Sequence, residues 1–310
     1  MSEFKLAPEH THRAFWDNSL PPAVVISPGD TVQFETPDVS DGQRRPGAGS
    51  ARPDPSRSYP LGGPVHVTGA EPGDSLIVEI LDFQPLGTGW ASFGPGRGLL
   101  GGEVTEPYIR FFDVSDGRYA RLREDIWIPI QPFCGTMGVA PAEPGRHPIA
   151  PPGPGGGNID VRHLTAGTRL ELPVLVPGAL FSAGDCHAAQ GDGEVCITGI
   201  ECAMRFRLRF DLVKQSGLQP WRFRFQTPPG SPQPGSDPAG YLATGATGPD
   251  LMENSRNAVR GTIEWLVANR GLSWEDAYIL CSLAGDLRIS EIVDAPNWVV
   301  TFHLSLAVFR

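Results

Sequence analysis

A turn that occurs twice, each time before an alternating apolar run, constrains the fold most. Residues 28–30 and 72–74 both read Pro-Gly-Asp, and the runs at 32–34 and 76–80 that follow place an apolar residue at every second position. A Pro-Gly turn leading into a period of two is typical of a β-strand. The chain also has 38 glycines and 32 prolines, which separate other apolar runs and do not form one tract. We therefore expect a mostly β fold with sandwich-like or barrel-like layers of short strands, one of them at residues 194–204. Residues 227–246 are rich in Pro and Gly without periodicity, so we expect a surface loop or a partly ordered lid there.

Helical periodicity is confined to the C-terminal part of the chain. Residues 252–270 gather apolar side chains on one side, and Gly271 is placed to end the helix. Ser273 and Asp276 then form a capping-box pattern for a second helix. We predict two C-terminal α-helices, within about 252–285, that cover a sheet. The length of 310 residues suits one catalytic domain, 1–310, with intimately packed β lobes.

Charge and cysteine content exclude several classes of partner. The formal net charge of -10 opposes binding to nucleic acid or an anionic membrane but does not affect a small neutral substrate. No stretch approaches the ~20 apolar residues of a membrane-spanning helix, and residues 1–13 are too polar for a signal peptide. The five cysteines are odd in number and form no CxxC pair, which favours reduced thiols. We expect a soluble, cytoplasmic protein.

The densest polar cluster is residues 184–194, between apolar runs on both sides. In an extended segment, residues two apart point the same way, so Asp185 and His187 would project into one space. A carboxylate beside an imidazole suits a divalent metal ion. The pattern is also compatible with a plain turn in which both side chains satisfy backbone amides and the glycines supply positive φ angles.

Two further segments carry candidate site residues. Residues 151–157 are glycine and proline only and lead into Asn158 and Asp160, so the backbone there can approach a ligand closely. The spacing matches neither a dinucleotide nor a phosphate-loop motif, and a structural loop explains it equally well. Residues 35–38 place two acids at the end of an alternating strand.

These segments together resemble the acetamidase/formamidase family. The specific motifs are GGNID from Gly156 and GALFSAGDCHAAQGDGE from Gly178, and the resemblance covers nearly the whole chain. It implies a mostly β fold and hydrolysis of a short amide, such as formamide or acetamide, to a carboxylate and ammonia. It also implies a divalent metal ion, for which we expect Zn²⁺. We further expect a homo-oligomer, a dimer or larger, with Trp16, Trp221 and the apolar C-terminal strand, residues 298–308, as interface candidates.

The resemblance also implies the residues of the site. We expect metal ligands among Asp38, Asp160, Asp185, His187 and Glu201, and catalytic residues among Glu194, His187 and Asn158. Our hypothesis makes Glu194 the proton shuttle and uses backbone amides of residues 155–158 to stabilise the oxyanion. The sequence departs from the family pattern at residues 43–61, which leaves open a substrate other than formamide or acetamide.

Other amidase mechanisms do not fit the residues present. Catalysis by Cys-Glu-Lys or Ser-Ser-Lys requires a lysine in the site, but the two lysines, Lys5 and Lys214, lie outside the polar clusters. A GxSxG nucleophile elbow is absent from the sequence. Cys186 beside His187 ranks below the metal because adjacent acids raise the pKa of a thiol. The alternative function is a metal-stabilised, non-catalytic binding or assembly protein of the same fold, which metal removal would distinguish.

Overall fold

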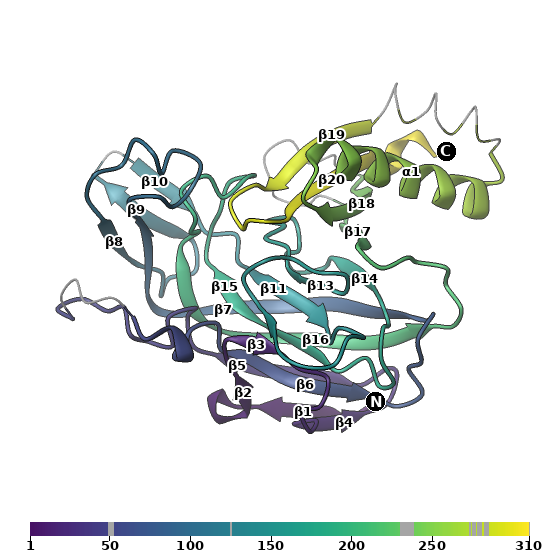
Figure 1. The fold of residues 1–310 in the computed structure, drawn as a ribbon, viewed down its shortest axis with the longest axis horizontal. Coiled ribbons are helices and arrows are strands. Elements are labelled where there is room, and N and C mark those ends of the chain that lie inside the picture. Colours follow the sequence, from purple (N-terminus) through teal and green to yellow (C-terminus); the bar gives the residue numbers. More distant parts are fainter. Residues whose placement is uncertain are drawn as a thin grey trace.

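The computed structural model describes residues 1–48, 53–124, 126–229, 239–272, 274, 277, 281 and 285–309. Most of the described elements are strands, as the turn-and-alternation pattern predicts (Figure 1). The strands are β1 Glu3–Leu6, β2 Thr11–His12, β3 Phe15–Trp16, β4 Val24–Ile26, β5 Thr31–Thr36, β6 Leu61–Val67, β7 Ser75–Phe93, β8 Tyr108–Asp113, β9 Tyr119–Arg123, β10 Ile126–Pro129, β11 Phe133–Val139, β12 His147–Pro148, β13 Gly156–Asn158, β14 Arg169–Pro173, β15 Phe181–His187, β16 Glu201–Val213, β17 Arg222–Gln226, β18 Tyr241–Gly248, β19 Gly285–Glu291 and β20 Trp298–Ser305. Among the described residues, the helical elements with assigned bounds are α1 Leu251–Arg270 and three short 3-10 turns, Pro8–His10, Pro55–Arg57 and Leu306–Val308.

One large sheet connects most of these strands. Among the described residues its main path runs β13-β11-β15-β16-β7-β14-β17-β18-β20-β19, with β5 and β6 joined at its side, and two small two-stranded sheets complete the set. The path brings β13, β11 and β15, which carry the motifs of residues 151–160 and 184–194, next to one another. The order of strands in the sheet therefore places the two candidate motifs side by side.

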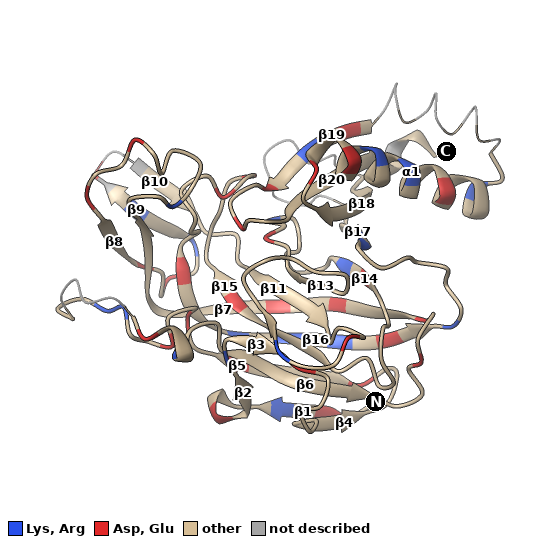
Figure 2. Ribbon diagram, in the orientation of Figure 1, with Lys and Arg blue, Asp and Glu red and all other residues tan. Residues whose placement is uncertain are grey.

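The longest pairing, between β7 and β16, separates the core from a charged face. Phe206 of β16 is buried and stacks on Phe34 of β5 at 4.9 Å between ring centroids. The alternate residues of β16 are arginines that form ion pairs with acids of the neighbouring strands, and Figure 2 shows blue residues on β16 beside red ones on β7. These half-exposed pairs each contribute little to stability. Their alternation with buried residues keeps the strand register unambiguous.

The first predicted helix is confirmed as α1. Asp250 caps it by accepting a hydrogen bond from the Glu253 amide at 3.0 Å, and Gly271 ends it at a φ of 65°. Its buried face packs against β18 and β20. The structure thus shows one of the two expected helices; the second, from Ser273 onward, lies outside the described residues except at three isolated positions. No helix in the described part of the chain is long and apolar enough to cross a membrane.

Two expectations from the local pattern are wrong. Residues 194–204 are expected to form one strand, but residues 194–200 form a turn and irregular backbone, and β16 begins at Glu201. Residues 227–246 were expected to be a surface loop, but Tyr241–Gly248 is the strand β18, buried throughout between β17 and β20. β18 shows no alternation of polar and apolar residues, because a strand that is buried on both faces has no polar side. Small residues such as Ala and Gly point to both faces.

Candidate active site

The site is built around His187, the last residue of β15. Asp185 lies two residues before it at a φ of 51°, a left-handed conformation that interrupts regular strand geometry. The two side chains nevertheless meet, with 3.6 Å between His187 Nε2 and Asp185 Oδ1. His187 also pairs in the sheet with Glu201, the first residue of β16. The strand pairing therefore brings a second acid to the imidazole.

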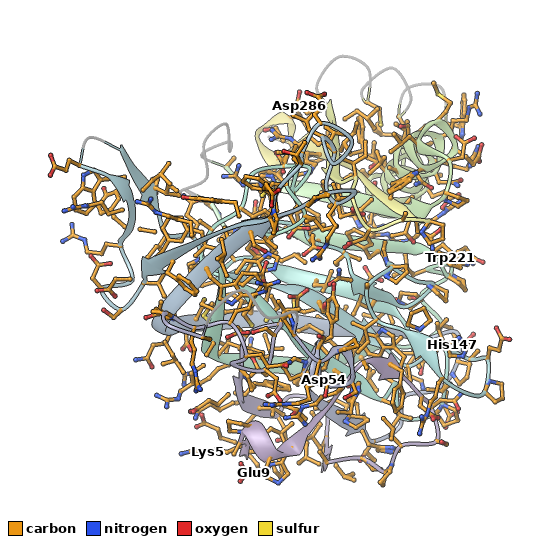
Figure 3. The ribbon with its side chains drawn as sticks, turned by 60° about the vertical axis from the view of Figure 1, so that its left-hand side comes forward. Lys5, Glu9, Asp54, His147, Trp221 and Asp286 are labelled. Carbon is orange, nitrogen blue, oxygen red and sulfur yellow. The ribbon has the colours of Figure 1, made fainter. Side chains whose placement is uncertain are left out.

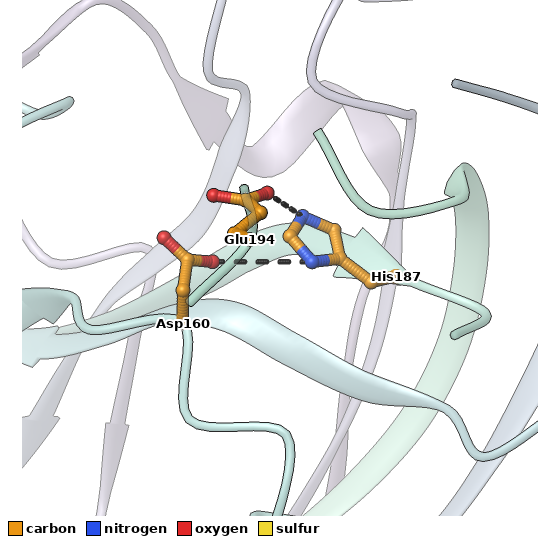
Figure 4. Close-up of side chains that lie close together, drawn as sticks. All are labelled: Asp160, His187 and Glu194. Atoms are coloured by element: carbon orange, nitrogen blue, oxygen red, sulfur yellow. Dashed lines mark ion pairs between the residues drawn. The ribbon is translucent and has the colours of Figure 1, made fainter. Parts of the chain in front are cut away.

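Four carboxylates surround this imidazole. Glu201 Oε2 lies 3.2 Å and Glu194 Oε1 4.0 Å from His187 Nε2, while Asp160 Oδ1 lies 3.9 Å from Nδ1. Figure 4 shows Asp160 and Glu194 directed at the two ring nitrogens. The residues form two overlapping groups, Asp160-His187-Glu194 and Asp185-His187-Glu201, whose ligand atoms lie within 4.8 Å of one another. All of these side chains are buried.

Backbone strain is concentrated at the same residues. Asp160, Asp185 and Glu194 all adopt positive φ angles, of 46°, 51° and 46°. A side chain in this region costs on the order of 1–3 kcal/mol and persists only where the surrounding structure holds it. Three such residues in one site indicate that the fold is shaped to bring these carboxylates together.

Two glycines allow the close approach. A Cβ atom at Gly199 would lie 2.8 Å from His187 Nδ1, and one at Gly135 would collide with Asp160 Oδ1. Any larger residue would therefore displace the imidazole or the carboxylate. Neither glycine was singled out from the sequence, because its importance depends on what lies across from it.

The electrostatics reflect an excess of acid. Burial raises the pKa of Asp160 and Glu194 well above the ordinary values, and that of Glu201 to about 7, where the His187 charge opposes the rise. For His187, burial acts to lower the pKa, but Glu201 and Asp185 outweigh it and raise the pKa well above its usual value. Neither carboxylate oxygen of Asp160 accepts a hydrogen bond from the described residues. A buried carboxylate without donors requires a cation or a proton.

The side-chain amide of Asn158 forms hydrogen bonds to three different segments around the site. Its Nδ2 donates to the carbonyl of Ala150 at 3.0 Å and to Asp294 Oδ2 at 2.6 Å, and its Oδ1 accepts from the Thr136 hydroxyl. The Thr136 hydroxyl also lies 3.2 Å from Asp185 Oδ2. Both amide hydrogens of Asn158 are thus engaged within the protein.

Other sequence-derived candidates lie apart from the carboxylate groups. Asp38 Oδ1 accepts from the amide and hydroxyl of Ser40, at 2.7 and 2.5 Å, and Asp38 belongs to neither group of ligand atoms. Burial raises the pKa of Asp38. In the glycine loop, the amide of Gly156 donates to the carbonyl of Gly153 at 3.2 Å. That amide is used inside the loop and is not free for an oxyanion.

The rival nucleophile and the lysines also lie elsewhere. Cys186 is fully buried, with its Sγ 3.4 Å from Cys134 Sγ and 3.6 Å from the Thr36 hydroxyl. Lys5 is exposed at the periphery of the molecule (Figure 3), and Lys214 bonds to Asp74 and the carbonyl of Gly69. The structure therefore agrees with the exclusion of lysine-dependent mechanisms.

Sequence reasoning missed two acids, Glu291 at the end of β19 and Asp294 just after it. Asp294 accepts the Asn158 hydrogen bond, and burial together with the Asp185 charge raises its pKa to about 7. Glu291 accepts from the Asp294 amide at 2.6 Å, and burial and the Asp294 charge raise its pKa to about 8. The available signal was a pair of acids three residues apart at the end of a strand, but nothing local relates that pair to residues 158–187.

Tyr59 is a further residue that the sequence did not indicate. It comes from the atypical segment 43–61 and adopts a φ of 52°. Burial raises the pKa of Tyr59 well above its ordinary value, and the charges of Asp294, Asp185 and Asp160 add to the rise. The atypical segment therefore reaches the site through this tyrosine.

Comparison with known proteins gives consistent results. The sequence profile of the "Acetamidase/Formamidase family" matches residues 3–147 and 142–310. The chain is 30% identical over 265 residues to an acetamidase of Mycolicibacterium smegmatis, covering 64% of this chain and 65% of that protein, and thus spans less than two thirds of that relative's length. It is 28% identical to a formamidase of Methylophilus methylotrophus, covering 95% and 88% of the two chains.

Solved structures agree with this match. The crystal structure of an acetamidase from Bacillus halodurans superposes with a TM-score of 0.88 at 33% identity, over 98% of each chain. A gamma lactamase from Delftia acidovorans superposes with a TM-score of 0.66 at 26% identity, over 97% of this chain and 89% of that one. The similarity therefore extends across both motif regions and the C-terminal strands.

Proposed function

The chain belongs to the acetamidase/formamidase family, and on that premise we propose that it hydrolyses a carboxamide to a carboxylate and ammonia at the site around His187. The observation that carries this proposal is the charge imbalance. Four buried carboxylates surround a single imidazole, and both oxygens of Asp160 lack hydrogen-bond donors among the described residues. An arrangement of this kind is costly to fold unless it binds a cation.

The residues present fit a divalent metal ion. Carboxylate oxygen and imidazole nitrogen are ligands of zinc, manganese and iron, and the unpartnered oxygens of Asp160 provide unused ligand capacity. We assign the ion to the group of Asp185, His187 and Glu201 and propose Asp160, from the overlapping group, as a further ligand. We leave Asp38 out of the set because Ser40 engages it, and propose Zn²⁺. When bound, such an ion lowers the pKa of water and polarises the amide carbonyl.

Glu194 supplies the proton transfers. Its carboxylate lies beside His187 and on the wall of a pocket, and burial raises its pKa, which makes it a stronger base for the proton of water. As water adds to the amide carbon, Glu194 accepts the water proton. It returns that proton to the nitrogen as the C–N bond breaks, and ammonia leaves the carboxylate product. We assign Asn158 a positioning role, because both of its amide hydrogens are engaged.

The test is ammonia release from formamide, acetamide, propionamide and urea, with metal analysis of the same sample. We expect turnover of one or more amides, loss of turnover on chelation and recovery on adding one metal. If chelation lowers only thermal stability and the metal-loaded protein hydrolyses none of these amides, the metal-stabilised binding or assembly protein is the better description.

We also propose that the chain is a cytoplasmic homo-oligomer. Aromatic residues on β8 and β10, among them Tyr108 and Trp127, are about half exposed, and Trp221 is 42% exposed at the molecular edge (Figure 3). Trp16 is 7% exposed, packed with Leu61 and Ile149, so it cannot serve an interface.

The described cysteines are free thiols, which supports a reducing compartment. Light scattering of the purified protein measures the oligomeric state directly.

A further inference from the structure

A pocket of about 380 Å³ lies directly beside the site. It opens between the β8–β10 region and the loop of residues 189–200. Residues of that loop, Gln190, Glu194 and Gly199, form the wall that faces the site. The opposite wall comes from β7, β8 and β10, which contribute Ala91 and other residues.

The shared wall is in direct contact with the imidazole. Gln190 Oε1 lies 2.7 Å from His187 Nδ1, and its Nε2 donates to the carbonyl of Asp160 at 2.9 Å. Gly199 lies so close to His187 that an added Cβ would be 2.8 Å from Nδ1. Glu194 Oε1 is 4.0 Å from His187 Nε2. A molecule in the pocket would therefore lie against the proton shuttle and next to the metal ligands.

The remainder of the pocket is mainly apolar. Phe112 and Ile200 are buried at 5% exposure, while Ile128 and Ala91 are half-buried and also line the space. An apolar recess of this kind favours the binding of a hydrocarbon group, because binding removes that group from water. Formamide has no such group and acetamide has only a methyl. The volume lies in the range of roughly 300–1,000 Å³ that accommodates considerably larger ligands.

We propose that this pocket binds an apolar substituent of the substrate, aromatic or branched aliphatic and larger than a methyl group, with the carboxamide held at Glu194. The substituent is attached either to the carbonyl carbon, in which case ammonia leaves, or to the amide nitrogen, in which case the corresponding primary amine leaves in place of ammonia. This inference rests on the proposed function and specifies its substrate class. The contacts of Gln190 and Gly199 with His187 place this pocket next to the carboxylate groups.

Two series of substrates test the inference on the metal-loaded enzyme. The first extends acetamide through isobutyramide to phenylacetamide, and the second extends formamide to N-benzylformamide. We expect kcat/KM for the best bulky amide to exceed that for acetamide by about 10-fold or more, the effect of a few buried methylene groups. A preference within the first series places the substituent on the acyl side, and a preference within the second places it on nitrogen; either supports the pocket.

Variants of the pocket separate its role from general damage. Ala91→Phe fills the space and should lower kcat/KM for the bulky amide by about 10-fold, a larger loss than for acetamide. Ile128→Ala enlarges the space at a half-buried position, which keeps the test valid if Ala91→Phe does not fold, and should also lower kcat/KM for the bulky amide. The matched control is Leu287→Ala, because Leu287 is an exposed apolar residue of β19 that does not line the pocket.

The possible failures are distinguishable. If formamide or acetamide is the best substrate and both pocket variants treat every amide alike, the inference is overturned while the amidase function stands. If the metal-loaded protein hydrolyses no amide in either series, the proposed function fails and the inference fails with it.

Discussion

The protein buries histidines in two regions, and the pKa of the imidazole is shifted in opposite directions in the two. His187 is 1% exposed among carboxylates, whereas His163 and His303 are 2% and 3% exposed among aromatic rings. The two rings of the second region lie 4.9 Å apart at 72°, and the Tyr241 hydroxyl bonds to His163 Nδ1. We refer to His163, Tyr241 and His303 as the aromatic cluster.

The pKa shifts follow from the neighbours. Burial lowers the pKa of His163 and His303, and no excess of acid reverses the effect. Around His187 the surrounding carboxylates do reverse it. Burial alone therefore favours neutral imidazole, and a surplus of carboxylates is what indicates a cation site. The loop of residues 189–200 contacts both regions, since Asp192 lies 3.6 Å from His163 Nε2 and Glu194 lies 4.0 Å from His187 Nε2.

The largest expected effect is the loss of turnover on Glu194→Gln. Removing a general acid and base typically lowers kcat by about 10²–10⁴-fold, and we expect the metal content to stay unchanged. Ammonia release and metal analysis measure the two quantities. Glu264→Gln is the control, because Glu264 is an exposed residue of α1 that pairs with Arg222 at 2.9 Å. Undiminished activity of Glu194→Gln would rule out its role as proton shuttle.

Metal removal should destabilise the carboxylate region and not the aromatic cluster. A ligand at 1,000 times its Kd stabilises a protein by about 4 kcal/mol, so chelation should lower the Tm of the wild type. Asp160→Asn removes the unpartnered carboxylate, and we expect its metal-free form to have a higher Tm than metal-free wild type and no response to metal. Thermal melts with and without Zn²⁺ measure this. Asp192→Asn, beside the aromatic cluster, should keep the metal response; a similar loss there would remove the distinction between the regions.

The same substitution at one histidine of each region should have different consequences. His187→Phe is expected to abolish metal binding and turnover. His303→Phe loses the hydrogen bond between Nε2 and the Thr301 hydroxyl, at 2.8 Å, which is worth about 1 kcal/mol, and should leave kcat unchanged. Urea unfolding and the amide assay measure the two effects. If His303→Phe also loses its metal, the two regions are one site.

The smallest expected effect is on the pH dependence of stability. The pKa of His303 is lowered in the folded state, so between that value and about 6.5, its ordinary value, the unfolded chain binds more protons. Stability that is present above about 6.5 is therefore lost as the pH falls. We expect the Tm of wild type to fall more between pH 7.5 and 5 than that of His303→Phe.

Glu291 changes the pH dependence of stability in the opposite direction. The pKa of Glu291 is raised to about 8, so its contribution to stability decreases as the pH rises from about 4.5, the ordinary glutamate value, toward 8. This contribution is the same in wild type and in His303→Phe, so it cancels in the comparison. If Tm depends on pH equally in the two proteins, burial does not lower the pKa of His303.

Sequence alone determined the features that depend on local chemistry. The Pro-Gly-Asp turns and the alternation after them predicted strands now seen as β5 and β7, and the periodicity before Gly271 predicted α1. These features are local because a turn or a helix is stabilised by residues only a few positions apart. The same is true of Asp185 and His187, which are close in sequence and in space.

The tertiary structure decided which distant residues share the site. Asn158 and Asp294 are 136 positions apart and bond at 2.6 Å, while Asp38, an equally acidic candidate, bonds to Ser40. The pairing of β15 with β16, which places Glu201 against His187, depends on the register of the whole sheet. Strand register is set by the packing of buried faces from many segments, so no single stretch of sequence specifies which carboxylates meet.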